Sequence, residues 1–294
     1  MSQQAEIRSD VPELPPALLR GVVEAALRED LGWGDVTSDS LLPAELTAEA
    51  TMVARGDGVV AGLPVARAAF HAMDPNLHVE LLARDGETVG AGRSLLRVAG
   101  RARAILSAER IALNFVQRMS GIATLTARYV AAVAGTDARI VDTRKTTPGL
   151  RLLEKYAVRC GGGHNHRFHL GDALLLKDNH RAALAAAGVG LVEAVHRARA
   201  ALPHTVTIEI ELDTLDQLDE TLAAEPDTIL LDNMPPEVLA EAVRRIGGRA
   251  RTEASGGITL ETVRRTAEAG VGLISVGALT HSAPAFDVAL DFNV

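Results

Sequence analysis

The 294-residue chain contains a single cysteine, Cys160. One thiol cannot form an internal disulfide, and it cannot supply a cysteine-based zinc cluster, so both features are excluded. A lone cysteine suits a reducing compartment, and we expect a cytoplasmic protein. Because Cys160 stands directly before three glycines, we interpret it as a small packing residue, with a nucleophile as the alternative.

The N-terminal residues lack a basic start followed by an apolar run, so we expect neither a secretory signal nor a membrane span. An excess of positive charge is also missing. The formal net charge of −8 opposes general nucleic-acid binding, which needs a basic face. Charged residues make up 23% and apolar residues 47% of the chain. This balance is typical of a folded globular protein rather than a disordered one.

Two kinds of pattern divide the chain. Residues 15–30 have helical periodicity, and residues 50–100 contain short strand candidates around a helix at 65–73. A long helical pattern over 104–133 then links two domains. From 138 to 279, short apolar strands alternate with amphipathic helices, which predicts a parallel sheet covered by helices. Six or seven such units favour a barrel over a doubly wound sheet. Residues 281–294 alternate like a strand that returns to the first domain.

Polar residues follow the apolar strands of the second part. In a parallel barrel all these positions point to one face, where such folds build active sites. The positions are Asp142, Thr143, Arg144, Lys145, Lys177, Glu211, Asp232, Ser255, Gly256, Gly257, Gly277 and Ala278.

Two glycine loops follow the last two strands, at residues 255–258 and 276–279. Exposed backbone N–H groups at such loops, with the help of a helix N-terminus, can hold a phosphate. A single glycine after a strand is usually only a tight turn. The two loops together favour phosphate binding.

Glu211 and Asp232 end two neighbouring strands. Paired carboxylates at this position suit Mg²⁺, bound directly or through water, or the stabilisation of a sugar cation. Hydrogen bonds to structural donors are the alternative. Glu209 lies on the same side of its strand as Glu211, so the functional carboxylate stays open between them.

Positive charge concentrates between Arg139 and His180, where eight lysines and arginines face four acids; the segment carries +4 and the remainder −12. This segment contains CGGGHNHRFH, which suggests either a metal site on His164, His166 and His169 or an anion site. The surrounding cations would repel a metal. A pocket for a small polyanion is therefore favoured over both the metal site and a solvated basic face. Its ligands would be Arg144, Lys145, His166, Arg167 and Lys177.

Several motifs resemble the quinolinate phosphoribosyltransferase family over nearly the whole chain: ALREDLGWGDVTS, ERIALNFVQRMSGIAT, DTRKTTPGLRLLEKYAVRCGGGHNHR, LLLKDNH, ILLDN, EASGGI and VGALTHS. The resemblance implies a pentosyltransferase that converts quinolinate and phosphoribosyl pyrophosphate, with Mg²⁺, to nicotinate mononucleotide, pyrophosphate and carbon dioxide in de novo NAD synthesis. It also implies an α/β fold with an N-terminal α/β sandwich, residues 1–112 with the return strand 282–294. The catalytic domain, residues 113–281, would be an incomplete, seven-stranded α/β barrel. The expected assembly is a homodimer or a hexamer of dimers.

The family pattern also implies roles for single residues. Arg144, His166, Arg167 and Lys177 would hold quinolinate, with Arg110 reaching in from the neighbouring subunit. Lys145, Glu211 and Asp232 would be catalytic. Phosphoribosyl pyrophosphate would contact Lys145, Lys177, Glu211, Asp232, Ser255, Gly256, Gly257, Gly277, Ala278 and His281, with Mg²⁺ at Glu211 and Asp232.

Three other functions compete with this one. A phosphoribosyltransferase for a different acceptor, such as nicotinate, would not need so many cations beside GGGHNHR. A phosphosugar-binding regulator without turnover would not need Glu211 and Asp232. A zinc protein built on the histidines predicts bound metal after purification.

Overall fold

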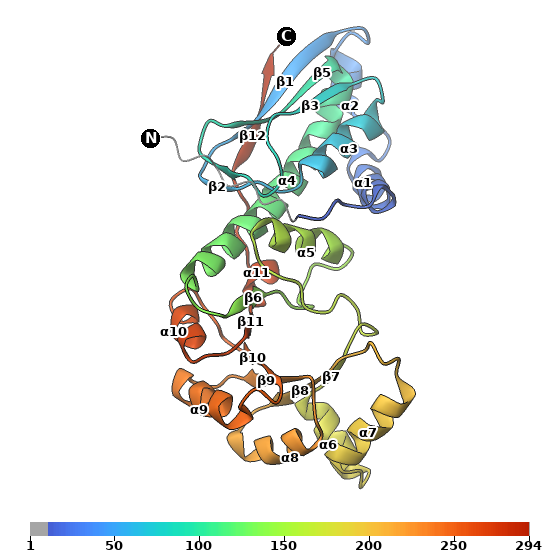
Figure 1. Ribbon diagram of the computed structural model, residues 1–294. Coiled ribbons are helices and arrows are strands. Elements are labelled where there is room, and N and C mark those ends of the chain that lie inside the picture. The colour runs from blue at the N-terminus through green and yellow to red at the C-terminus, as the bar shows by residue number, and fades with distance from the viewer. Residues whose placement is uncertain (1–10, 294) are drawn as a thin grey trace. The chain divides into compact units, whose positions relative to one another are not determined.

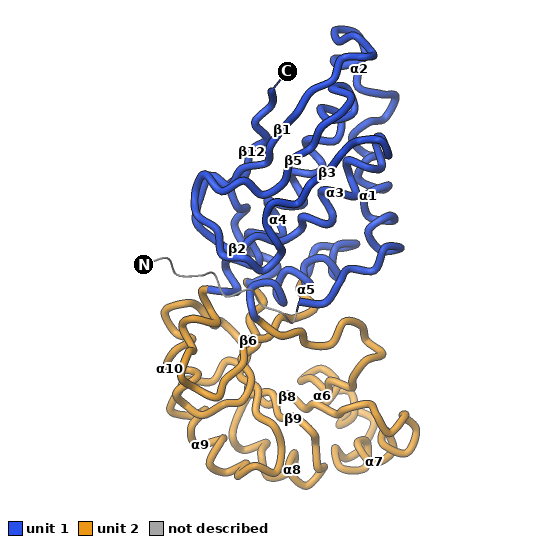
Figure 2. The backbone as a smooth tube through the Cα atoms, turned by 45° about the horizontal axis from the view of Figure 1, so that its top comes forward, with its two compact units in different colours: residues 1–127, 146–162, 279–294 blue, residues 128–145, 163–278 orange. Residues whose placement is uncertain are grey.

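The computed structural model describes residues 11–293, which form two compact units (Figures 1 and 2). Unit 1 comprises residues up to 127 together with 146–162 and 279–294, and unit 2 comprises residues 128–145 and 163–278. Within the described residues, no helix combines the length and the apolar character needed to cross a membrane. The fold is mixed α/β, as the alternating pattern predicts.

Unit 1 is built on an antiparallel sheet with the strand order β12-β1-β5-β3. Alternate side chains of β1, including Ala50 and Met52, are fully buried, which is the period-2 pattern of a half-buried strand. Helix α3 packs on β3 and β5, and α1 packs on α3. The strands are β1 (Thr47–Ala54), β2 (Gly58–Val59), β3 (His78–Leu81), β4 (Thr88–Val89), β5 (Ser94–Arg101) and β12 (Val288–Asn293).

Most helices of unit 1 agree with the sequence pattern. They are α1 (Pro16–Leu31), α2 (Val36–Leu41), α3 (Leu63–Met73), α4 (Ala102–Ala132), which continues into unit 2, α5 (Arg151–Cys160) and α11 (Ala278–His281), which begins at the unit boundary. The short α2 was not predicted, because residues 31–40 contain glycines and small polar residues. Its start is explained by Asp35, whose side chain accepts a hydrogen bond from the backbone N–H of Ser38 at 3.0 Å. Near the C-terminus, β12 pairs antiparallel with β1.

Unit 2 contains a six-stranded sheet with the order β6-β11-β10-β9-β8-β7, in which every neighbouring pair is parallel. Figure 1 shows α8, α9 and α10 outside these strands. The strands are β6 (Arg139–Val141), β7 (Leu174–Leu176), β8 (Ile208–Leu212), β9 (Thr228–Asp232), β10 (Arg251–Ser255) and β11 (Leu273–Ser275). The helices are α6 (Asp178–Ala186), α7 (Leu191–Ala201), η1 (Leu215–Gln217), α8 (Leu218–Ala223), α9 (Pro236–Ile246) and α10 (Val263–Glu268).

Helix α5 belongs to unit 1, although the expected boundaries placed it in the catalytic domain. Its buried residues explain the difference. Glu154 accepts hydrogen bonds from the guanidinium of Arg118 on α4, at 3.1 and 2.7 Å. Tyr156 donates its hydroxyl to Asp85 at 2.8 Å, and Asp85 also accepts the backbone N–H groups at the start of α3. Three cations of the positive segment, Arg151, Lys155 and Arg159, lie on this helix.

Candidate active site

A polar cavity of about 380 Å³ lies in unit 2. Its walls come from residues at or just beyond the carboxyl ends of the parallel strands, the edge at which α/β sheets place their ligands. The cavity brings together eight residues that the sequence predicted for the site: Arg144, Lys145, His166, Arg167, Lys177, Glu211, Asp232 and Ser255.

The other predicted residues do not line this cavity. Gly256, Gly257, Gly277 and Ala278 belong to unit 2, whereas Arg110 on α4 and His281 on α11 belong to unit 1. Their roles stay predictions. The helix expected from Thr259, directly after the loop 255–258, begins only at Val263, so a turn separates the first glycine loop from a helix N-terminus.

The geometry at Gly256 requires glycine. Its φ is +90°, and an added Cβ would overlap the side chain of Asn233 and lie 2.8 Å from the backbone nitrogen of that residue. Asn233 itself adopts φ +54° and donates its side-chain amide to the Asp232 carboxylate at 2.6 Å. The first glycine loop therefore packs against the residue that orients Asp232.

Two arginines give the cavity its positive side. The guanidinium of Arg167 donates to the carbonyl oxygen of Ala173 at 2.9 Å. Burial lowers the pKa of Arg167, and the nearby charge of Arg144 lowers it further. An arginine stays protonated despite such shifts. Two guanidinium groups held close together against their repulsion favour a ligand with more than one negative charge.

Lys177 stands between β7 and α6, because β7 ends at Leu176 and α6 begins at Asp178. The backbone N–H of Lys177 donates to Nδ1 of His180 at 3.0 Å, which caps the helix. The Lys177 ammonium lies 2.6 Å from a carboxylate oxygen of Glu211, with the lysine side chain about half exposed and the carboxylate buried. Lys177 therefore joins the cationic side of the cavity to its acidic side.

The carboxylates of Glu211 and Asp232 line the acidic side of the cavity. Asp213 does not line the cavity, but its ligand atom and those of Glu211 and Asp232 lie within 4.8 Å of one another. Oxygen ligands of this kind fit Mg²⁺. Asp213 was not predicted, because it is exposed and follows the end of β8. Its position two residues after Glu211 is the signal that could have found it.

Glu209 and Glu211 have different neighbours, which separates two carboxylates that the sequence left as alternatives. Glu209 lies 3.0 Å from Nε2 of His166, whereas Glu211 contacts Lys177. A third acid, Glu253 on β10, lies 3.6 Å from the same His166 nitrogen. Glu253 was not predicted as a site residue. It stands two residues before Ser255, the same spacing that relates Glu209 to Glu211.

Asp142 is fully buried and supports the loop that carries the histidines. It accepts hydrogen bonds from the Asn165 side chain at 2.6 Å and from the His166 backbone N–H at 2.8 Å. In residues 11–293, the ligand atoms of His164 and His169 belong to no group of metal-binding geometry. The arrangement therefore does not support the three-histidine metal site.

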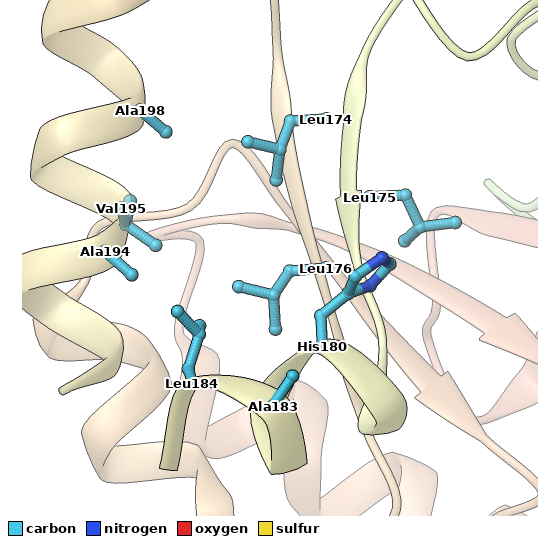
Figure 3. A pocket seen from close by; sticks show the side chains of 9 residues that line it. All are labelled: Leu174, Leu175, Leu176, His180, Ala183, Leu184, Ala194, Val195 and Ala198. Atoms are coloured by element: carbon cyan, nitrogen blue, oxygen red, sulfur yellow. The ribbon is translucent and has the colours of Figure 1, made fainter. Parts of the chain in front are cut away.

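A second pocket, of about 410 Å³, lies beside β7 under α6 and α7 (Figure 3). Leu174 and Leu176 point toward these helices, while the side chain of Leu175 points to the other side of the strand (Figure 3). Leu175 also lines the polar cavity. Strand β7 thus separates an apolar helix-facing layer from the candidate site.

The structure favours the packing interpretation of Cys160. The residue is buried in unit 1, and burial raises the pKa of its thiol well above the ordinary value, with the charge of Asp85 adding to the effect. A buried thiol that stays protonated is a poor nucleophile.

Comparison with known proteins identifies the family of the chain. The family model for the N-terminal domain of quinolinate phosphoribosyl transferase matches residues 35–120, and the model for the C-terminal domain matches residues 122–291. The chain is 47% identical to a nicotinate-nucleotide pyrophosphorylase [carboxylating] of Mycobacterium leprae, over 92% of this chain and 96% of that protein. It is 44% identical to a probable enzyme of the same name from Bacillus subtilis, over 90% of each.

Solved structures agree with this assignment. NadC from Streptococcus pyogenes is 40% identical, with a TM-score of 0.90 over 96% of this chain and 99% of that one. The nicotinate-nucleotide pyrophosphorylase from Francisella tularensis is 35% identical, with a TM-score of 0.89 over the same shares. The chain therefore belongs to the quinolinate phosphoribosyltransferase family.

Proposed function

We propose that the chain transfers the phosphoribosyl group of phosphoribosyl pyrophosphate to quinolinate with decarboxylation. The products are nicotinate mononucleotide, pyrophosphate and carbon dioxide, in de novo NAD synthesis. The observation that carries the proposal is one cavity lined both by the cations Arg144, Arg167 and Lys177 and by the carboxylates Glu211 and Asp232. A diacid fits the cations, and a ribosyl cation fits the carboxylates.

The cationic residues act first by binding. Arg144, Arg167 and Lys177 hold the two carboxylates of quinolinate, and His166 lines the same cavity. Holding the pyridine ring in this way places its nitrogen for attack on the ribose C1, which replaces a bimolecular encounter by an oriented one.

The acidic residues act as charge develops. As the C1–oxygen bond to pyrophosphate breaks, positive charge grows on the ribose, and fixed carboxylates at Glu211 and Asp232 stabilise it. The ring nitrogen then forms the new bond to C1. When the carboxylate next to the ring nitrogen departs as carbon dioxide, the adjacent positive nitrogen stabilises the electron pair left on that ring carbon. This carbon then takes up a proton from water, so no protein base is required.

The phosphate groups have their own proposed ligands. Lys145 lies in the cavity near the expected pyrophosphate. The 5′-phosphate would be held at the two glycine loops, and the family resemblance adds His281 as a contact. The backbone N–H groups of these loops offer donors without added charge. The proposed contacts are Ser255, Gly256, Gly257, Gly277, Ala278 and His281.

The acidic side also suits a cation. Glu211, Asp213 and Asp232 would hold Mg²⁺, directly or through water, and the ion would neutralise charge on the leaving pyrophosphate. The clustering of their oxygen atoms within 4.8 Å supports this assignment.

We also propose that the six-stranded sheet forms the wall of an incomplete seven-stranded barrel. Two pairings support this architecture. The last strand, β11, pairs with the first, β6, and His164 forms a parallel bridge with Val141 of β6. Around such a wall the six strands follow their order in the chain. His164 extends the wall beyond β6, and the gap that keeps the barrel incomplete would lie between His164 and β7. The antiparallel sheet and helices of unit 1 would form the α/β sandwich.

A homodimer, or a hexamer of such dimers, is the proposed assembly, with Arg110 entering the partner's cavity. Arg110 is exposed on α4, which leaves its side chain available for a partner. Cytoplasmic localisation stays a prediction from the sequence.

A product assay tests the function. With quinolinate, phosphoribosyl pyrophosphate and Mg²⁺, the purified protein should release nicotinate mononucleotide and carbon dioxide in equal amounts.

Arg167→Ala should raise the KM for quinolinate about tenfold or more, since a charged hydrogen bond contributes about 1.5–3 kcal/mol. The same variant should change the KM for phosphoribosyl pyrophosphate far less. Arg197→Ala, at an exposed position of α7, is the matched control. Turnover of nicotinate in place of quinolinate would refute the diacid assignment.

A further inference from the structure

The ring of His166 has a protein partner at each nitrogen. Its Nδ1 accepts the backbone N–H of Arg167 at 2.8 Å, so this nitrogen carries no proton. The proton therefore sits on Nε2, which lies 3.0 Å from a carboxylate oxygen of Glu209 and can donate to it. In this arrangement both ring nitrogens are engaged by the protein, and the ring is fixed in one tautomer.

Two buried acids surround that donor. Glu209 and Glu253 are 6% and 1% exposed, and one oxygen of each has no hydrogen-bond partner among the described residues. Two carboxylates this close are not both ionised at low cost. Burial, followed by the charge of Glu209, raises the pKa of Glu253 to about 7. A protonated Glu253 can donate to Glu209, which leaves Glu209 as the charged acceptor for His166.

We propose that Glu209 and Glu253 are positioning residues that fix the ring of His166, and that His166 in turn fixes Arg167 for substrate binding. The backbone of His166 is held from the other side by Asp142 at 2.8 Å, and the guanidinium of Arg167 is held at Ala173. The ring of His166 completes this support, because its Nδ1 accepts the backbone N–H of Arg167, whose guanidinium enters the cavity. His166 thus acts on the substrate through Arg167 rather than through its own ring nitrogens.

The same three residues have ligand atoms within 4.8 Å of one another, which is also compatible with a metal ion. The hydrogen-bond arrangement is favoured because Arg167 lies directly beside the cluster and the charge of Arg144 acts on Arg167. These fixed positive charges oppose a divalent cation. A metal at this cluster is accordingly an outcome that the experiment must be able to detect.

Steady-state kinetics give the first test, and this part rests on the proposed function for the identity of the substrate. Glu253→Ala should raise the KM for quinolinate about tenfold, while kcat and the KM for phosphoribosyl pyrophosphate stay within about twofold. Glu253→Gln keeps a donor toward Glu209 and should recover most of the loss. Glu237→Gln, an exposed acid paired with Arg265, is the control. Equal effects on both substrates, or a glutamine variant as impaired as the alanine variant, would overturn the proposal.

Ring NMR gives a second test that needs no activity and no variant at Glu253. In protein labelled with ¹⁵N-histidine, with the His166 signals assigned by their loss in His166→Gln, the wild-type ring should show a protonated Nε2 and a bare Nδ1. A proton on Nδ1, or exchange between tautomers, would contradict the geometry.

Elemental analysis that finds one divalent ion per chain, lost in Glu253→Ala, would replace the proposal with a metal site. If quinolinate is not a substrate, the proposed function fails while the NMR result still decides this inference.

Discussion

At the scale of single residues, Glu253 couples the candidate site to pH. Its pKa lies at about 7 in the folded protein, above its ordinary value of 4.5, and Glu209 and His166 are the titratable groups that face it. The native state therefore binds more protons than the unfolded state between these two values. The stabilising contribution is complete below about pH 4.5 and is lost as pH rises through about 7.

This sign gives a prediction for Glu253→Gln, because glutamine does not titrate. The free energy of unfolding of the wild type, minus that of the variant, should fall as pH rises from 5 and should level off above about pH 7. Urea unfolding of both proteins at each pH measures the difference, and titration of all other groups cancels to first order. A difference that is constant across this range would show that Glu253 is ionised throughout.

The carboxylates also show what could be predicted about single residues. Strand periodicity correctly placed Glu209 and Glu211 on one side of β8, since both are buried and both meet charged groups of unit 2. It could not assign their partners. The neighbours of each are set by the stagger of strands that are distant in sequence, and His166 reaches Glu209 from a loop 43 residues earlier.

At the scale of elements, close approach of two backbones fixes the position of α4. An added Cβ at Gly121 would overlap the carbonyl oxygen of Pro284 and lie 3.1 Å from its carbonyl carbon. Both residues belong to unit 1. Glycine is normally unfavourable inside a helix, so its presence here is explained by the contact with the segment that leads into β12.

Gly121→Ala should therefore lower the thermal stability. Overpacking of this kind costs about 1–3 kcal/mol, which exceeds the gain in helix propensity of about 1 kcal/mol. Gly21→Ala in α1 is the matched control, because an added Cβ there meets no described atom within 4 Å. Calorimetry should show a lower Tm for the first variant and an equal or higher Tm for the second. Equal Tm values for Gly121→Ala and the wild type would mean that the backbones separate at no cost.

Elements differ in how well the sequence predicted them. Helix α7 and strand β9 occupy the positions that their periodicity indicates. Helix α6 was missed because it follows Lys177 without a turn and buries none of its residues, so it has no apolar stripe to detect. Helix α5 was predicted as a helix, but its partners could not be predicted, because its buried Glu154 and Tyr156 bind residues of unit 1 that are distant in sequence.

At the scale of the whole molecule, the alternation of strands and helices predicted the parallel sheet of unit 2, and the alternating C-terminus predicted a strand that returns to unit 1. Both predictions follow from local periodicity. The parallel sheet is confirmed, and β12 near the C-terminus pairs with β1. The division into compact units could not be predicted in the same way. It depends on long-range contacts, such as those of Arg118 with Glu154 and with the Ala283 carbonyl, which leave no periodic signal.

The proposed sharing of Arg110 between subunits predicts complementation. Arg110→Ala and Lys177→Ala should each be nearly inactive alone. If a dimer contains one chain of each kind, one of its two sites combines an intact Lys177 with an intact Arg110 from the other chain. Random exchange makes half of the dimers mixed, so the mixture should recover about one quarter of wild-type activity in a closed two-fold assembly.

Native mass spectrometry must first confirm that mixed dimers form, and each variant incubated alone under the same conditions is the control. Recovery that rises with the fraction of mixed dimers would place Arg110 in the partner's site. Arg110 is exposed on α4, so its loss should leave the fold intact and the two subunits free to exchange. An absence of recovery despite full exchange would mean that each chain builds its site alone, and Arg110 would then have to act within its own subunit.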